Sequence, residues 1–207
     1  MNYISLIGDI VNSRGIKSRD TFQKKLDSEL KKINKENPNL LSPYTLTLGD
    51  EFQAVYGKAD NLFIDIWKLM IGLHPQKVRF ALGVGTLTTP VNPKRAIGMD
   101  GPAFHYARSG ISELKKTPYL MKIEGQNIKH LSLMNNTLFL ISQVSGGWGL
   151  NRFQVLNGLL QGWASNKIAS SLGISAVAVY KNIKAGSLDL IIDLQKEISN
   201  VLNEVLR

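Results

Sequence analysis

Hydrophobic and polar positions follow two periods along the first 145 residues, and these periods predict strands and helices in turn. Continuous or alternating apolar runs predict strands at 3–8, 44–48, 52–56, 78–87 and 119–123. Apolar residues three or four positions apart predict helices at 19–35, 60–73, 100–116 and 132–145. This order is typical of a ferredoxin-like βαββαβ fold with additions.

The pattern changes after this region. Gly146-Gly147-Trp148-Gly149 interrupts the periodicity, and the chain from residue 151 onward is nearly all helical in pattern. We therefore expect an α+β protein with two domains. The first covers residues 1–146, and the second, all-α domain covers residues 147–207.

The second domain contains a bihelical motif between residues 166 and 183. Gly173 stands where a turn needs a positive φ, and Ser175 can cap the helix that follows. Apolar residues that can pack the two helices together are Ile168, Leu172, Ile174, Val179 and Ile183. The motif resembles the DNA-binding helix-turn-helix of bacterial regulators. The resemblance implies that the major groove or the phosphates are faced by Ser175, Ala176, Val177, Tyr180, Lys181 and Lys184.

Two alternatives stay open for this region. The motif can be a plain helical hairpin, and Tyr180 can be a core aromatic.

The last helix carries an a/d stripe formed by Ile191, Leu194, Ile198, Val201 and Val205. That stripe can pack on its own domain or on a second copy, so a homodimer is one of the expectations.

Charge narrows the class of partner. The 207 residues carry a net charge of +9 and give a pI near 9.7. This charge favours a polyanionic partner, which can be nucleic acid, nucleotide phosphates or an anionic membrane face, although a soluble basic protein without such a partner is the alternative. The absence of cysteine excludes disulfides, thiol nucleophiles and cysteine zinc sites. No signal peptide or membrane span is visible in the sequence, so we expect a cytoplasmic protein with no membrane partner.

Two Gly-Asp steps carry the candidate chemistry. Asp9 interrupts the first apolar run, and Asp50 lies between the second and third. Burying a carboxylate in such a position costs about several kcal/mol of desolvation free energy, unless the carboxylate is paired or holds a cation. A sheet that brings both together can form a Mg²⁺ site, whereas turn roles are the alternative for each. Glu51 is expected to point away from Asp50, behind the site or to the surface.

Four segments resemble known nucleotide-binding domains: Gly8-Asp9-Ile10-Val11-Asn12-Ser13, Leu48-Gly49-Asp50-Glu51-Phe52, residues 78–85 and residues 98–108. They are similar to the metal-binding and central-strand segments of class III nucleotide cyclases, and the second also resembles the GGDEF signature of diguanylate cyclases. The resemblance implies that Asp9 and Asp50 bind metal and that Arg108 stabilises charge at a phosphate. Arg14 lies just past the first segment, where it can meet a bound phosphate or only solvent.

Two departures argue against turnover. Leu46 stands where purine cyclases keep a base-reading lysine, and Phe104 stands where they keep a catalytic asparagine. An apolar residue does neither job, so no residue is assigned a catalytic role. The fold class implied is a ferredoxin-like (cyclase/palm-like) βαββαβ domain followed by an all-α helix-turn-helix domain.

The chain as a whole resembles the SatD family of bacterial proteins, whose name refers to a locus linked to secretion and acid tolerance. The expected function is a DNA-binding transcriptional regulator whose palm-like domain binds a metal-nucleotide or polyphosphate ligand. Two alternatives remain: a nucleotidyl-transfer enzyme of unknown substrate, and a protein-interaction adaptor with an inactive palm domain.

Overall fold

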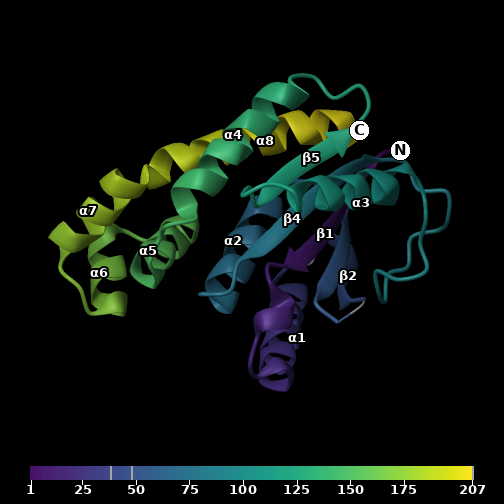
Figure 1. Ribbon diagram of the computed structural model, residues 1–207. Coiled ribbons are helices and arrows are strands. Elements are labelled where there is room, and N and C mark those ends of the chain that lie inside the picture. The colour runs from purple at the N-terminus through teal and green to yellow at the C-terminus, as the bar shows by residue number, and fades with distance from the viewer. Residues whose placement is uncertain (38, 48, 207) are drawn as a thin grey trace.

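The computed structural model describes residues 1–37, 39–47 and 49–206. Its centre is a mixed five-stranded sheet in the order β2-β3-β1-β4-β5 (Figure 1). Strand β1 is antiparallel to both of its neighbours, β2 is antiparallel to β3, and β4 is parallel to β5. The strands are β1 (Tyr3–Ile10), β2 (Leu40–Leu46), β3 (Glu51–Tyr56), β4 (Val78–Gly85) and β5 (Met121–Gly125).

Within the described ranges the chain forms eight α-helices and one 3₁₀ turn, η1 (Ser13–Gly15). The helices of the first 145 residues are α1 (Arg19–Glu36), α2 (Leu62–Leu73), α3 (Pro102–Leu114) and α4 (Leu131–Ser145). The remaining helices are α5 (Leu150–Leu160), α6 (Ser165–Leu172), α7 (Ala176–Gly186) and α8 (Leu188–Leu206). The protein is therefore of mixed α+β composition, with the sheet confined to its first 125 residues.

Several element boundaries differ from the sequence-based expectation. Strand β2 begins at Leu40 because Leu40 and Ser42 already pair with β3, and the expected last residue of that strand, Leu48, lies outside the described residues. Strand β5 lies two residues later than expected, since its pairing with β4 runs from Met121 to Gly125. Strand β1 extends through Ile10, so Asp9 lies inside the strand rather than after it.

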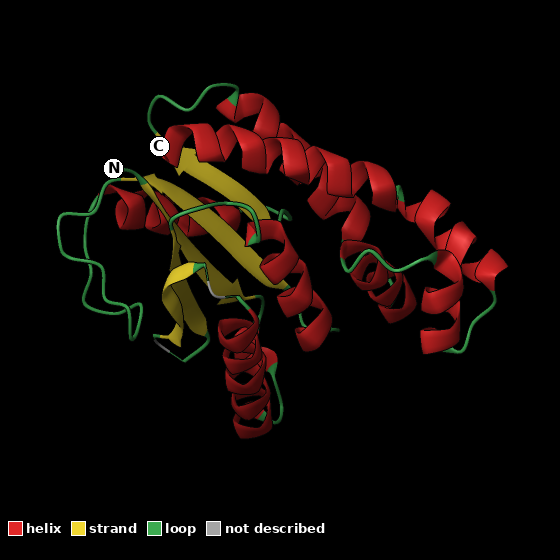
Figure 2. Ribbon diagram, turned by 180° about the vertical axis from the view of Figure 1, so that it is seen from behind, coloured by secondary structure: helices red, strands yellow, loops and turns green. Residues whose placement is uncertain are grey.

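Helices cover both faces of the sheet (Figures 1 and 2). Because successive strand residues point to opposite faces, Ile4 and Leu6 enter the main core with α1 and α2, whereas Ile7 faces α3. The smaller core on the α3 face consists of Ile7, Ala81, Ala107, Ile111 and Leu114. Burial on both faces explains why β1 is apolar nearly throughout.

Helix α3 lies unusually close to the sheet at Gly83. A Cβ atom built on Gly83 would be 2.0 Å from the carbonyl oxygen of Ala103 and 2.3 Å from the nitrogen of Ala107. Glycine at this position therefore permits the close approach of helix and strand, rather than forming a phosphate-binding loop. This close approach fixes the position of α3 and of its polar side chains relative to the sheet.

The C-terminal helices pack against the N-terminal half of the chain. Trp148 stacks on Trp67 of α2 with a ring-centroid distance of 5.8 Å. Helix α8 runs back across the molecule toward the N-terminus (Figure 1), and Asn2 donates a hydrogen bond of 3.0 Å to the carbonyl of Val205. One cluster of buried residues consequently includes members of the sheet, α2, α5 and α8. The apolar stripe of α8 is thus covered largely by this same chain.

Candidate functional site

A charged hollow lies at the end of β1 where the strand meets η1. It has a volume of about 710 Å³. Its walls come from the end of β1, η1 with the residues around it, the start of β3, the start of β4 and the residue after α3. The charged residues that line it are Asp9, Arg14, Arg19, Asp50, Glu51, Arg79 and Lys115.

Three of these residues form a row across the sheet. Asp9 is the register partner of Glu51 on β3 and of Arg79 on β4. Odd-numbered β1 residues face α3, as Ile7 does, so all three side chains stand on that face. Asp9 is only 5% exposed, and it therefore requires a cationic partner.

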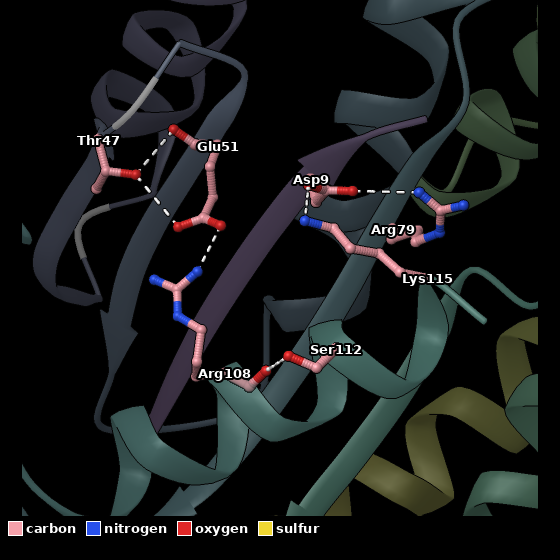
Figure 3. A network of polar contacts seen from close by, with 7 residues as sticks. All are labelled: Asp9, Thr47, Glu51, Arg79, Arg108, Ser112 and Lys115. Carbon is pink, nitrogen blue, oxygen red and sulfur yellow. Dashed lines mark hydrogen bonds and ion pairs between the residues drawn. The ribbon is translucent and has the colours of Figure 1, made fainter. Parts of the chain in front are cut away.

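Asp9 has two such partners (Figure 3). Its Oδ1 lies 2.8 Å from Nζ of Lys115, the residue after α3, and its Oδ2 lies 3.2 Å from Nη1 of Arg79. Lys115 is half exposed, whereas the side chain of Arg79 is largely buried. Asp9 is therefore a paired carboxylate, because two cations of the protein neutralise it.

Glu51 also lines this hollow, although the sequence predicted a position behind the site or at the surface. Its side chain is 12% exposed and forms an ion pair with Arg108 of α3 (Figure 3). The hydroxyl of Thr47 donates to the backbone oxygen of Glu51 at 3.1 Å. The carboxylates of Asp9 and Glu51 are thus both paired with cations from α3 or its end, Lys115 and Arg108.

Asp50 lies on the wall of the same hollow as Asp9. It is half-buried in the turn before β3, and its carbonyl accepts a hydrogen bond of 3.3 Å from the nitrogen of Ile10. Arg14 is exposed and also lines the hollow, whereas Arg108 reaches it only through Glu51. Among the described residues there is no group of three or more His, Cys, Asp or Glu side chains arranged to hold a metal ion.

The hollow is weakly cationic. Four basic and three acidic side chains line it, which leaves one net positive charge. The Nε atom of Arg79 is buried and has no hydrogen-bond partner within residues 1–37, 39–47 and 49–206.

A second candidate surface is formed by α6 and α7. Gly173 adopts φ +64° between the two helices, and the Ser175 hydroxyl accepts a hydrogen bond of 3.1 Å from the nitrogen of Ala178. Ile168 and Val179 are fully buried where the helices pack. The turn and the cap therefore have the chemistry that the sequence predicted for them.

The outer side of α7 is exposed. Val177 is 63% exposed and Tyr180 is 58% exposed, so Tyr180 is not a core aromatic. Lys181 and Lys184 are exposed as well, whereas Ala176 is half-buried against the core. Apolar and aromatic side chains are thus presented to solvent beside two lysines.

This part of the chain is also free of acidic residues. Between Glu124 and Asp189 the sequence contains no aspartate or glutamate. Lysines 167, 181 and 184 all lie on α6 or α7. The side chains of α6 and α7 therefore carry only positive charge, and the next acidic residue along the chain is Asp189, in the first turn of α8.

The structure therefore defines a mixed α+β protein that has a charged hollow on one face of its sheet and an exposed basic helix pair near its C-terminus. The SatD family model matches residues 3–202, and the chain belongs to the SatD family. A comparison with curated proteins finds no match. Among the described residues, no helix is both long enough and apolar enough to cross a membrane.

Sequence reasoning missed three cations of the hollow: Arg19, Arg79 and Lys115. Arg79 had a detectable signal, because it alternates with the apolar residues Val78 and Phe80 and therefore faces the other side of its strand. Lys115 had none, since it is far from Asp9 in sequence and meets it only through the packing of α3.

Proposed function

We propose that this protein is a DNA-binding transcriptional regulator whose sheet domain binds a nucleotide or polyphosphate in the Asp9 hollow. The observation that carries the proposal is the exposed face of α7. Val177, Tyr180 and Lys181 stand there in solvent, within a stretch of chain that has no carboxylate. A basic helix face with exposed side chains able to contact base edges is the usual requirement for reading the major groove.

The proposed DNA-binding domain comprises residues 147–207, and α6 and α7 form its helix-turn-helix. Ser175, Ala176, Val177 and Tyr180 contact base edges or nearby phosphates, and Lys181 and Lys184 contact phosphates. The positive φ of Gly173 and the cap by Ser175 support this assignment. A homodimer in the cytoplasm belongs to the proposal, because helix-turn-helix proteins commonly bind paired half-sites as dimers.

The proposed ligand-binding domain comprises residues 1–146 and has a ferredoxin-like, cyclase-like topology. The strand order β2-β3-β1-β4, with β1 antiparallel to both neighbours, supports that topology. The location of Asp9 and Asp50 on one hollow supports a common role for the two carboxylates.

The chemistry of the hollow favours an anion. Arg14, Arg19, Arg79 and Lys115 line a space large enough for a nucleotide. Because Lys115 and Arg79 already neutralise Asp9, a cation is most simply bound together with the phosphates. In that case Asp9 and Asp50 would hold Mg²⁺, which would neutralise phosphate charge.

The enzyme alternative has less support. Phe104 is 8% exposed and Leu46 is half-buried, so both are packing residues at the positions where a cyclase needs polar groups. Arg108 is engaged by Glu51. For nucleotidyl transfer, the polar groups that read the base and assist catalysis would have to come from other residues, such as those of a second copy of this chain. The adaptor alternative replaces DNA binding with protein binding and leaves the palm domain inactive.

Fluorescence anisotropy with duplex DNA from the protein's own upstream region tests the regulator proposal. The variant Lys181→Ala/Lys184→Ala should weaken DNA binding by about tenfold or more at low salt. The matched control Lys32→Ala/Lys35→Ala changes two exposed lysines of α1 and should leave affinity within about twofold. Equal loss in both variants, or no DNA association by the wild type, would contradict the proposal.

Calorimetric titration with ATP, GTP and inorganic triphosphate, each with and without Mg²⁺, tests the ligand proposal. Arg14→Gln/Arg19→Gln should weaken the binding of phosphates, whereas Arg95→Gln, on an exposed loop residue outside the hollow, should not. If none of the three compounds binds in either condition, the hollow is not a polyphosphate site, and the DNA-binding proposal stands or falls separately.

A further inference from the structure

Helix α4, which packs on β5 and lies beside α8 (Figure 1), presents an apolar stripe to solvent. Leu133 is 65% exposed, Leu140 is 61% exposed and Val144 is 41% exposed. With the half-buried Thr137 between them, these residues follow one another at spacings of four, three and four, so they share one face of the helix. Elsewhere in the described ranges, exposed large apolar side chains stand singly, apart from the pair on α7. Clustering of this kind marks a contact surface.

The opposite side of α4 is fixed on the sheet. The side chain of Asn135 donates a hydrogen bond of 2.9 Å to the carbonyl of Ile123 and accepts one of 2.8 Å from its nitrogen. Ile123 belongs to β5, an edge strand of the sheet, so Asn135 satisfies backbone groups that would otherwise be open. At about 100° per residue, Leu133 and Leu140 lie on the side of the helix away from Asn135. The stripe is therefore held in place from behind.

The stripe lies in a stretch of sequence without charge. Between Lys129 and Arg152 the chain has no lysine, arginine, aspartate or glutamate, although one residue in five of the whole chain is charged. Surface helices ordinarily carry charged residues on their outer face. The exposed polar neighbours of the stripe include Asn136 and Gln143, which are uncharged. Depletion of charged residues distinguishes the centre of a protein interface from other surface, so the composition of α4 is that of an interface.

The charge of the chain indicates what covers this stripe. Two copies with a net charge of +9 each repel one another, and α4 is a face on which contact adds no pair of like charges. In a two-fold interface the surface meets itself, and an uncharged stripe is compatible with itself. A partner of another kind is usually selected by opposite charge, which α4 does not offer. The apolar stripe of α8, the other candidate for a second copy, is covered largely by its own chain.

We propose that α4 is the dimerisation surface of this protein and packs against α4 of a second copy through Leu133, Leu140 and Val144. The regulator proposal includes a dimer, but contact through α4 requires neither DNA nor a ligand in the Asp9 hollow. A stripe of this length is smaller than the interface of about 800 Å² per partner that stable complexes bury, so the dimer should dissociate with a micromolar Kd.

Sedimentation velocity of the full chain without DNA, from micromolar to submillimolar concentration, tests this proposal. The wild type should shift from monomer to dimer, and added salt should not weaken the dimer, because salt screens the repulsion between copies. Leu133→Lys/Leu140→Lys should weaken the dimer by about tenfold or more, since two lysines from each copy would meet at the contact. The matched control Leu190→Lys, at a leucine of α8 that is 58% exposed, should leave dimerisation within about twofold.

An exchange of charge separates a contact between copies from a loss of fold. Leu133→Glu/Leu140→Glu should also be monomeric alone, and mixing it with the lysine variant should restore a dimer that contains one chain of each, because opposite charges then meet. Thermal unfolding checks that both variants are folded. A chain that dimerises in this way but does not bind DNA would contradict the regulator proposal alone.

Contact through α4 is ruled out if the wild type stays monomeric throughout the range, if the lysine variant dimerises like the wild type, or if the mixture stays monomeric. An equal loss of dimer in Leu190→Lys would also rule it out. Binding of monomeric wild type to phosphatidylcholine vesicles, lost in the lysine variant, would assign the stripe to a lipid surface and overturn the proposal.

Discussion

Asp9 and Glu51 are opposite each other on β1 and β3, yet each carboxylate pairs with a different cation from α3 or its end. Lys115 binds Asp9 at 2.8 Å, and Arg108 binds Glu51. Like charges directly opposite across strands are destabilising. The cations of α3 therefore allow two adjacent carboxylates to remain on one face of the sheet, and they couple the position of α3 to the charge of the hollow.

The pairing of Asp9 predicts an asymmetry between the two candidate metal ligands. Asp9→Asn should lower the free energy of unfolding by about 1–3 kcal/mol, because it leaves the largely buried Arg79 without its counter-ion. Asp50→Asn should change it by less than about 0.5 kcal/mol, since Asp50 is half exposed in a turn. Urea unfolding measures both. An Asp9→Asn protein as stable as the wild type would show that repulsion from Glu51 outweighs the ion pairs.

Close packing of α3 predicts a large effect at Gly83. Gly83→Ala should destabilise the protein by about 3 kcal/mol or more, because the new methyl group would meet backbone atoms of Ala103 and Ala107 that cannot move aside locally. Gly147→Ala is the control, since nothing lies within 4 Å of its Cβ position. Thermal and urea unfolding of the two variants should differ accordingly; equal stabilities would mean that α3 shifts easily over the sheet.

A buried carboxylate in α2 predicts a pH effect on stability. Asp65 is 1% exposed; burial raises its pKa, although hydrogen bonds from Tyr56 and Asn37 act in the opposite direction. Because the folded pKa is above the unfolded one, the proton on Asp65 favours the folded state at low pH. This contribution is lost as the pH rises through the folded pKa.

Asp65→Asn keeps an acceptor for Tyr56 and carries no charge at any pH. Its stability relative to the wild type should therefore improve as the pH rises from about 4, near the ordinary carboxyl pKa, toward neutrality. Urea unfolding of both proteins across this range measures the difference. A difference that stays constant with pH, or that falls, would contradict the raised pKa.

The exposed face of α7 predicts two kinds of DNA-binding defect. Lys181→Ala and Lys184→Ala should each reduce the salt dependence of binding by about one unit in the log–log slope, because each removes a phosphate contact. Val177→Ala should instead change the preference among sequences, with little effect on the slope. A selection experiment on random duplexes, combined with salt titrations, distinguishes these outcomes. Identical defects in all three variants would indicate a loss of fold instead.

The apolar residues at the cyclase-like positions predict no turnover. Losing one oriented catalytic donor costs about 10²–10³ in rate. If the resemblance to the cyclases holds, Leu46 and Phe104 stand where two such groups are needed. Purified protein with ATP or GTP and Mg²⁺ or Mn²⁺ should form no cyclic product above background, as measured by chromatography. A cyclic product that disappears in Asp50→Ala would establish the enzyme alternative.

The sequence alone determined the order of strands and helices, because each element buries an apolar face with its own period. It also located the capped turn at Gly173 and Ser175, since φ and capping preferences are local properties of single residues. The two Gly-Asp steps and the acid-free C-terminal stretch are likewise readable without coordinates. These features suffice for the overall class and for the candidate regions.

Tertiary structure decided which charges meet. Lys115 neutralises Asp9 only because Gly83 lets α3 approach the sheet, and Arg108 meets Glu51 for the same reason. Gln195 meets its hydrogen-bond partner Trp67 only in the folded chain, because the two residues are 128 positions apart in the sequence. Helix periodicity predicts that a face is buried but not what buries it. Ion pairs and hollows between distant elements are therefore properties of the packed chain, not of any segment by itself.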